Sequence, residues 1–251
     1  MTGKAERPQV PPGSADRPQE PAAPPPVGAL PVLQVEAPGP FTLVQDLGRT
    51  GRRAVGVPVS GAMDRFAIAA ANLLVGNAES AAALECALAG PRLVALSSCV
   101  VAVTGRTLPE PARPAYSAEP EVGAMPGPHV RRLSARARRT FFRERWAVSR
   151  DSDRMGYRLE GPELEIQGAE LLSFGLAMGC VQVPASGQPI LLMADHQTAG
   201  GYPVVAGVAR ADLPLVAQLL PGDHLTFREV SVEAAQGEWR RLRSALDALR
   251  R

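Results

Sequence analysis

Short runs of alternating apolar and polar residues, most of them ended by glycine or proline, recur along this 251-residue chain. A period of two is typical of strands, and Gly or Pro after each run indicates a turn. The strand candidates are VLQVEAP, FTLVQDLG, ALECALAGP, RLVALSSCVVAVTG, YRLEG, LEIQG, ELLSFG, CVQVP and PILLMAD. ALECALAGP and RLVALSSCVVAVTG are rich in Val and Leu, which predicts buried strands. The pattern predicts a mainly β protein with a few short helices.

Four segments have helical spacing instead. Asp64 is a predicted N-cap for the helix in DRFAIAAANLLVGN, which ends where Gly76 adopts a left-handed conformation. A second helix is expected in RRLSARARRTFFRERW, with Leu133, Phe141 and Phe142 inward; a third begins near Asp212, and the tail WRRLRSALDALRR forms an amphipathic fourth.

Composition divides the chain into five parts. We expect a disordered Pro-rich arm at 1–30, a first half at 31–107, a linker at 108–128, a second half at 129–232 and the C-terminal helix at 233–251. The motif VPVSG at 57–61 recurs as VPASG at 183–187, which indicates two related β-rich halves, each with a Ser-Gly turn at the end of a strand, unless the match is a coincidence.

Charge and composition exclude several functions. The 27 Lys and Arg residues nearly balance 25 Asp and Glu residues, so we expect neither nucleic-acid nor membrane binding. Lys4 is the single lysine and lies in the Pro-rich arm, which excludes a Schiff-base lysine, a P-loop lysine and a biotinylated carrier lysine in the ordered part.

The cysteines and the N-terminal sequence bear on the compartment. Cys86, Cys99 and Cys180 lie far apart among apolar residues, so they are predicted to be reduced and buried. The histidines lack metal-ligand spacing, so no metal site is predicted. No apolar run follows the first basic residues, so we expect a cytoplasmic protein without a signal peptide.

Polar side chains concentrate in four patches between the apolar strands. Two lie in the first half, around Gln45-Asp46 and around Asn72. The third is SDRMGYR, whose Asp and Arg form either a self-satisfied turn or a ligand site. The fourth is VPASGQPILLMADHQTAGGYP, whose amides suit either a small amide or carboxylate ligand or a strand-turn-strand whose polar groups satisfy one another.

Several long motifs occur together and in one order. They are TLVQDLGRTGRRAVGVPVSGAMD, NLLVGN, ALECALAGP, SDRMGYRLEGP and VQVPASGQPILLMADHQTAGGYPVVAGVARADLPLVAQLLPGD. In these motifs, from about Val32 to about Val230, the chain resembles the KipA family. That family includes the C subunit of bacterial ATP-dependent 5-oxoprolinase and is similar to the carboxyltransferase domain of biotin-dependent urea carboxylase. The resemblance implies two cyclophilin-like β-barrel halves.

The resemblance also implies which residues line a site. In the first half the family's motif positions fall on Gln45, Asp46, Arg49, Ser60, Gly61, Asp64, Asn72 and Glu85. In the second half they fall on Asp153, Arg154, Gln182, Gln188, Asp195, Gln197, Thr198, Gly200, Gly201 and Tyr202. We take these as substrate-binding candidates, with Asp195 as the candidate general base.

The chain departs from the family in one respect. Family members carry a long stretch of further strands between the VTG motif and the GP that opens the second half, whereas here roughly twenty residues remain, from Arg106 to Met125. The first barrel half is therefore expected to be incomplete, and its exposed strand edges would be a liability unless a partner covers them.

Three functions follow as expectations. The first is a subunit of a 5-oxoprolinase that works with ATP and two partner subunits, one of them KipI-like, to hydrolyse a cyclic amide to glutamate. The second is a non-catalytic binding or regulatory module for a KipI-like partner. The third is a component of a biotin-dependent carboxyltransferase, with biotin carried by another protein.

Overall fold

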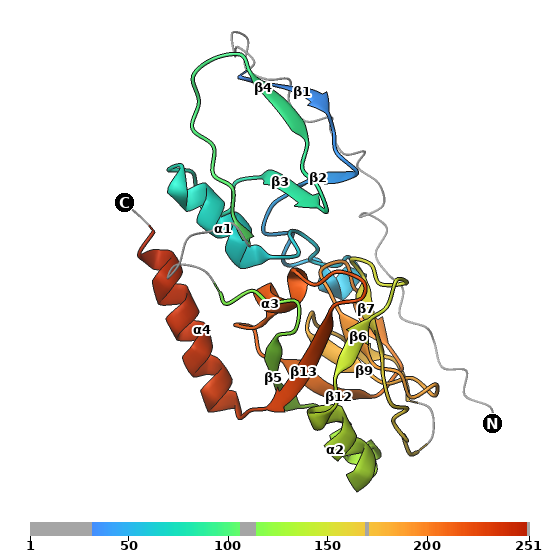
Figure 1. The fold of residues 1–251 in the computed structure, drawn as a ribbon. Coiled ribbons are helices and arrows are strands. Elements are labelled where there is room, and N and C mark those ends of the chain that lie inside the picture. Colours follow the sequence, from blue (N-terminus) through green and yellow to red (C-terminus); the bar gives the residue numbers. More distant parts are fainter. Residues whose placement is uncertain (1–31, 106–113, 169–170, 250–251) are drawn as a thin grey trace, which may run out of the picture.

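Seven strands between residues 121 and 229 close into a β-barrel in the computed structural model of this protein (Figure 1). The structure describes residues 32–105, 114–168 and 171–249. The expected Pro-rich arm therefore lies outside the described residues. Around the barrel the strand order is β10-β7-β6-β13-β5-β12-β9, and only β13 and β5 pair in parallel. The barrel strands are β5 (Glu121–Pro126), β6 (Trp146–Val148), β7 (Gly156–Glu160), β9 (Cys180–Gln182), β10 (Ile190–Leu192), β12 (Val204–Val208) and β13 (His224–Glu229).

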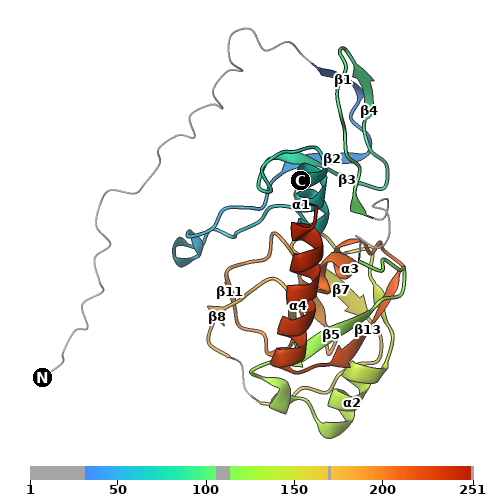
Figure 2. The same ribbon diagram turned by 90° about the vertical axis from the view of Figure 1, so that its left-hand side faces the viewer.

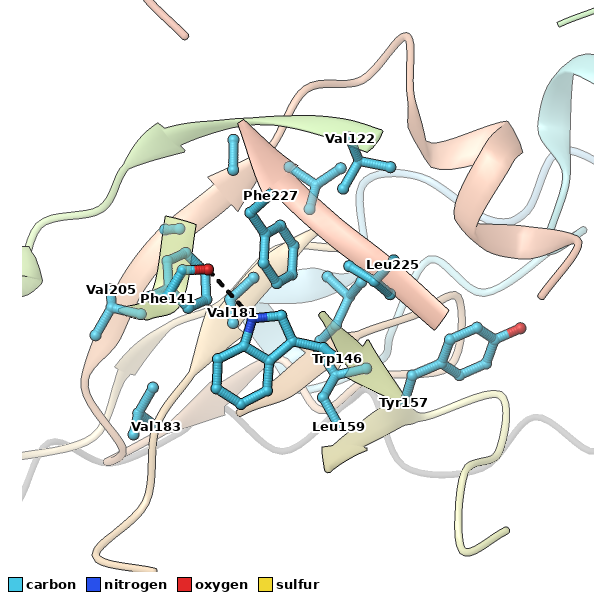
Figure 3. Close-up of a cluster of buried hydrophobic side chains, with 14 of the residues drawn as sticks. Val122, Phe141, Trp146, Tyr157, Leu159, Val181, Val183, Val205, Leu225 and Phe227 are labelled. Atoms are coloured by element: carbon cyan, nitrogen blue, oxygen red, sulfur yellow. Dashed lines mark hydrogen bonds between the residues drawn. The ribbon is translucent and has the colours of Figure 1, made fainter. Parts of the chain in front are cut away.

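Four aromatic side chains lie among the aliphatic side chains of the barrel core, although aromatics make up only 4% of the sequence (Figure 3). The rings of Phe141 and Phe227 stack with centroids 4.5 Å apart. Trp146 is fully buried and satisfies its indole N–H by donating to the Phe141 carbonyl at 3.1 Å. A buried aromatic ring contributes a large apolar area, so these few residues anchor the core.

Within the described residues, the first half forms no barrel. Its four strands make two separate two-stranded antiparallel sheets, β1 with β4 and β2 with β3. Both views place β1 and β4 far from the barrel (Figures 1 and 2). The strands are β1 (Leu33–Ala37), β2 (Phe41–Gln45), β3 (Ala83–Ala87) and β4 (Arg92–Ala95). The expectation of an incomplete first half is confirmed.

The predicted burial of this half is wrong. Most of the exposed large apolar side chains of the described chain belong to it, including Val44 and Leu88, which are 70% and 78% exposed. The segment 96–104, expected to extend the last strand, has no regular structure. Cys86 and Cys99 are exposed, whereas Cys180 is half-buried. A strand has the same alternating sequence pattern whether or not a second layer of structure covers its apolar face. In the described residues, no such layer covers the strands of the first half.

The four predicted helices are present. They are α1 (Arg65–Leu74), α2 (Ala135–Arg143), α3 (Leu213–Ala217) and α4 (Val232–Asp247), with short 3-10 turns η1 (Arg53–Val55) and η3 (Val130–Arg132). Asp64 caps α1 by accepting from the Ala67 amide at 2.8 Å. Gly76 has φ 78°, as predicted after that helix. Leu133 and Phe141 are buried, and Phe142 packs against the same core.

The helix α4 joins the two halves. It runs from the barrel edge to α1 (Figure 2). There Leu246 packs with Phe66, Ala69 and Ala70 in a small second core. The C-terminal helix therefore covers part of the apolar face of α1.

Two predicted segments differ from the structure. The expected linker at 108–128 contains β5, a strand of the closed barrel. The sequence did not predict this strand because Pro residues surround its short EVGAMP run. LEIQG makes only an isolated bridge, Leu133 to Ile166. ELLSFG yields the two-residue strand β8 (Phe174–Gly175), which pairs with β11 (Ala199–Gly200) outside the barrel.

The two VPxSG motifs end alike. Gly61 and Gly187 have φ 86° and 72°, and a Cβ at either would lie within 3 Å of neighbouring backbone atoms. A strand precedes the second motif but not the first, so the predicted strand-turn is confirmed only at 183–187. Within the described ranges, no helix is long and apolar enough to cross a membrane.

Candidate functional site

Arg154 links the two halves of the chain. Its guanidinium donates to Asp195 through Nε at 2.8 Å, to Glu85 of β3, and to the carbonyl of Gly61. The three side chains are mostly shielded, with 15% of Arg154, 22% of Glu85 and 34% of Asp195 exposed. We call Arg154, Glu85, Asp195 and the Gly61 carbonyl the junction cluster.

Local turns position the arginine. The carboxylate of Asp153 accepts from the amides of Met155 at 2.8 Å and Gly156 at 3.1 Å, which fixes the turn before β7. The Asp195 amide donates to the Arg154 carbonyl at 2.8 Å. Arg154 and Asp195 are therefore joined by a backbone hydrogen bond as well as by their side-chain ion pair.

Glu85 is held in a poorly solvated position. Burial raises the pKa of its carboxyl above the usual 4.5, and the nearby carboxylates of Asp195 and Asp64 raise it further. A hydrogen bond from the Met63 amide, at 2.7 Å, and the charge of Arg154 oppose that shift. Burial is therefore the main cause that disfavours the charged form of Glu85.

Several first-half candidates shape the loop that presents Gly61. Asp46 accepts from the Gly48 amide at 2.6 Å, and its carbonyl accepts from the Ala62 amide. Arg49 donates from Nε to the Pro58 carbonyl at 3.3 Å. Ser60 has φ 53°, the left-handed region that non-glycine residues seldom adopt. These residues act on the loop conformation, and Gln45 ends β2 opposite Ala83.

Asp64 and Asn72 are buried structural residues. Asp64 accepts from the Tyr116 hydroxyl and from Gln218 Nε2, both at 2.8 Å, in addition to capping α1. Burial raises its pKa against the effect of those hydrogen bonds. Asn72 donates to the Ala81 carbonyl at 2.7 Å and so holds the loop between α1 and β3.

A second group of candidates lines a cavity of about 590 Å³ on the outer face of the barrel, over β7, β9 and β10. Its predicted members are Asp153, Gln182, Gln197 and Tyr202. Gln182 is only 1% exposed, donates to the Tyr202 carbonyl at 3.2 Å and accepts from Gln197 at 3.4 Å. We call this space the barrel cavity.

The barrel cavity and the junction cluster adjoin along the chain. Asp153 and Gln197 line the cavity, and nearby residues in the sequence, Arg154 and Asp195, enter the cluster. Gly200 lies against Gln182, since a Cβ there would come within 2.9 Å of Leu176 and 3.4 Å of the Gln182 amide. The structure thus brings together most of the second-half candidates.

Besides Gly200, three second-half candidates lie outside both the cavity lining and the junction cluster. The Gln188 side chain forms two hydrogen bonds with the Gly161 backbone: its Oε1 accepts from the Gly161 amide and its Nε2 donates to the Gly161 carbonyl, both at 3.1 Å. The carbonyl of Thr198 accepts from the Leu176 amide, and a Cβ on Gly201 would approach the Leu171 carbonyl. Their roles are local.

Two polar residues of the cavity were not predicted as site residues. Arg158 lies on the exposed side of β7, between the core residues Tyr157 and Leu159. Ser186 belongs to the second VPxSG turn. The alternating pattern of β7 could have predicted the outward position of Arg158, because the residues on either side of it both point into the core.

His196 lies beside Asp195 and is 3% exposed. Burial lowers its pKa, while its Nδ1 lies 2.6 Å from the Gln197 carbonyl. In the described parts of the chain, no three His, Cys, Asp or Glu side chains are grouped to hold a metal ion.

The family model for the carboxyltransferase domain, subdomain A and B, matches residues 55–110 and 106–229. The chain belongs to this carboxyltransferase domain family. The two matched segments meet at 106–110, so the break in the family's pattern falls where the sequence predicted the missing strands.

Two relatives within the family match most of the chain. The C subunit of 5-oxoprolinase from Haemophilus influenzae is 31% identical, over 83% of this chain and 94% of the relative. The protein of the same name from Escherichia coli is 31% identical, over 81% and 93%. The first alignment has 291 positions, whereas 83% of 251 residues is about 208, so about 80 positions have no residue in this chain.

Two solved structures have a similar fold. The Kluyveromyces lactis urea amidolyase superimposes with a TM-score of 0.77 at 22% identity, over 87% of this chain and 20% of that protein. The urea carboxylase from the same yeast gives a TM-score of 0.75 at 22% identity, over 87% and 29%. This chain therefore spans about a fifth of the amidolyase, and the likeness concerns the fold.

Proposed function

We propose that this chain is a subunit of an ATP-dependent 5-oxoprolinase, which opens the cyclic amide 5-oxoproline to glutamate. The observation that carries the proposal is the likeness to two 5-oxoprolinase C subunits over more than nine-tenths of their lengths. Two partner subunits, one of them KipI-like, complete the enzyme in this proposal. ATP is bound with those partners, where it supplies the phosphoryl group that activates the lactam carbonyl.

The barrel cavity is the proposed substrate site. A lactam presents one N–H donor and one carbonyl acceptor, and the exposed amide of Gln197, which Gln182 holds through a hydrogen bond, can offer the complementary pair. Arg158 supplies a cation for the substrate carboxylate, since a guanidinium binds carboxylates through two parallel N–H groups. Asp153 and Tyr202 line the same space.

Asp195 is the proposed general base for water. Its carboxylate accepts from Arg154 at 2.8 Å and retains 34% exposure, so water can reach it. In the proposed reaction, water attacks the activated carbonyl carbon while Asp195 takes its proton, and the ring C–N bond breaks as the ring nitrogen takes up a proton. A second water then hydrolyses the resulting acyl phosphate to glutamate and phosphate. The junction cluster orients that carboxylate.

An Asp195→Asn substitution tests the site. In the enzyme assembled with both partner subunits, we expect glutamate formation from 5-oxoproline to fall about 100-fold or more. Asp151→Asn, at an exposed position of a neighbouring loop, is the matched control and should retain full activity. Melting temperatures of both variants separate lost chemistry from lost folding. A folded Asp195→Asn variant with full activity would remove the base assignment.

A non-catalytic binding or regulatory role is the second candidate. The exposed strands of the first half favour it, because an apolar, edge-rich surface of this kind is typical of an interface. In this case the chain would bind a KipI-like partner tightly without supporting turnover. A carboxyltransferase role would require biotin on another protein, since the only lysine is Lys4.

A further inference from the structure

A second cavity, of about 450 Å³, lies where the first half, the barrel and α4 meet. One wall comes from η1 and the start of α1, another from Met178 and Arg210 of the second half, and the third from Trp239 and Leu246 of α4. Figure 2 shows α4 running across this junction. We call it the junction cavity; it shares no lining residue with the barrel cavity.

Three arginines give the junction cavity a positive charge. Arg53, Arg65 and Arg210 line it, and among the described residues none of them has a carboxylate within 4.0 Å. The cavity lining also contains Arg243 and Glu79, whose charges cancel. Arg243 donates two hydrogen bonds to the Glu79 carboxylate, at 2.5 and 2.8 Å. The charges of Arg65 and Arg210 act on each other, and like charges without a directly paired carboxylate favour a bound anion.

Arg65 carries a donor with no acceptor. Its Nη2 donates to the Leu47 carbonyl, but its Nε is buried without a hydrogen-bond partner among the described residues. A buried polar group without a partner is costly and rare, so an acceptor from outside the chain would stabilise this position. Burial lowers the pKa of Arg65, and the charge of Arg210 lowers it further, although Asp46 opposes the shift.

The other walls are apolar. Phe66, Leu213 and Leu246 contribute to them, and Arg210 lies over the ring of Trp239 at 4.0 Å from the centroid. Pockets of this size and mixture hold small organic ligands, with a few polar groups fixing the orientation. An anionic group at the arginines and an apolar body against α4 match these walls.

We propose that the junction cavity binds a small organic oxyanion, a carboxylate or a phosphate ester with an apolar body. Arg53, Arg65 and Arg210 hold the anionic group, and Trp239 contacts the body. Part of this site lies outside the residues that the family model matches, because that match ends at residue 229 and α4 begins at Val232. Binding in this cavity does not depend on 5-oxoproline hydrolysis.

Tryptophan fluorescence gives a direct readout. The chain has two tryptophans, and Trp146 is fully buried in the barrel, so a ligand in the junction cavity changes the signal of Trp239. The probes are phenyl phosphate and benzoate, titrated at constant ionic strength, with neutral benzyl alcohol as the control. We expect a saturable change with at least one anion and none with the alcohol. Which anion binds distinguishes a phosphate site from a carboxylate site.

Substitutions locate the binding. Arg210→Gln should weaken binding about tenfold or more, because it removes one charge-assisted hydrogen bond. Arg53→Gln serves the same purpose if Arg210→Gln fails to fold. Arg150→Gln, an exposed arginine that does not line the cavity, should leave the affinity unchanged, and Trp239→Phe should abolish the signal. No saturable change with either anion, or equal affinity in a folded Arg210→Gln variant, would overturn the proposal.

Discussion

At the scale of single residues, Arg154 contributes several bonds to the contact between the halves. It satisfies two partly buried carboxylates from different halves and one backbone carbonyl. Replacing it with Met leaves Glu85 and Asp195 without their cation, and an unpaired buried charge is strongly destabilising. We expect Arg154→Met to lower the free energy of unfolding by about 2–3 kcal/mol, allowing for the partial exposure of Asp195. Urea denaturation measures this change.

An exposed ion pair provides the control for Arg154. Arg228 donates to Glu121 at 3.0 Å, but the two side chains are 54% and 61% exposed. Water screens such a pair, so Arg228→Met should cost less than about 1 kcal/mol. Equal losses in the two variants would show that the junction cluster contributes no more than a surface pair.

Gly61 is constrained by both its conformation and its neighbours. It has φ 86°, and a Cβ there would lie 2.6 Å from the Gly48 amide nitrogen. Gly56 has φ 82° and open space around the same position. We expect Gly56→Ala to cost about 1 kcal/mol from backbone strain alone, and Gly61→Ala to cost clearly more, about 3 kcal/mol. Thermal unfolding of both variants checks the difference, and equal costs would rule out the clash.

At the scale of elements, α1 depends on a buried carboxylate. Asp64 has its pKa raised by burial, so the native state holds its proton more tightly than the unfolded chain, whose value is 3.8. The resulting stability is present below that value and is lost as the pH rises through the folded pKa. The advantage of the wild type over Asp64→Asn should therefore shrink as the pH rises from about 4 to 7. Urea unfolding across this range tests it; a constant or growing advantage would contradict it.

In the helix α4, one substitution is expected to stabilise the protein and another to destabilise it. Gly237 lies in its interior, and a Cβ added there would have no atom within 4 Å, so Gly237→Ala should stabilise the protein by about 0.5–1 kcal/mol. Ser231 caps the helix by accepting from the Ala234 amide at 3.2 Å, so Ser231→Ala should cost about 1 kcal/mol. Melting temperatures should move in opposite directions. A shared direction would mean that α4 does not contribute as a docked helix.

Element types were predictable from the sequence because they depend on local patterns. Asp64 before α1, the amphipathic tail and the short strands ended by Gly or Pro each have a local signal. β5 was missed because its neighbours are Pro-rich, although it pairs with β13 and β12 in the barrel. Burial was predicted less well, since exposure of β3 and β4 depends on which other elements are present.

The candidate site was predictable in part for the same reason. The motif positions Gln182, Gln197 and Tyr202 do meet in one cavity, and Arg154 meets Asp195. The bond between Arg154 and Glu85 joins residues 69 apart in the sequence, and no local pattern reveals it. The junction cavity likewise depends on tertiary contacts, because Arg65 and Arg210 come from different halves.

At the scale of the whole molecule, a complete barrel carries an incomplete first half. Relatives have about 80 more aligned positions, and here the strands β1 to β4 expose apolar side chains. Such a surface is a stability liability for an isolated chain and is typical of a face that a partner covers. We therefore expect activity only from the assembled complex.

The most direct test is ADP release by this chain mixed with its two proposed partner subunits, with and without 5-oxoproline, beside a mixture that lacks this chain. We predict ADP release that requires both this chain and 5-oxoproline. Tight association without such turnover, or ADP release that is the same without this chain, would contradict the proposed function.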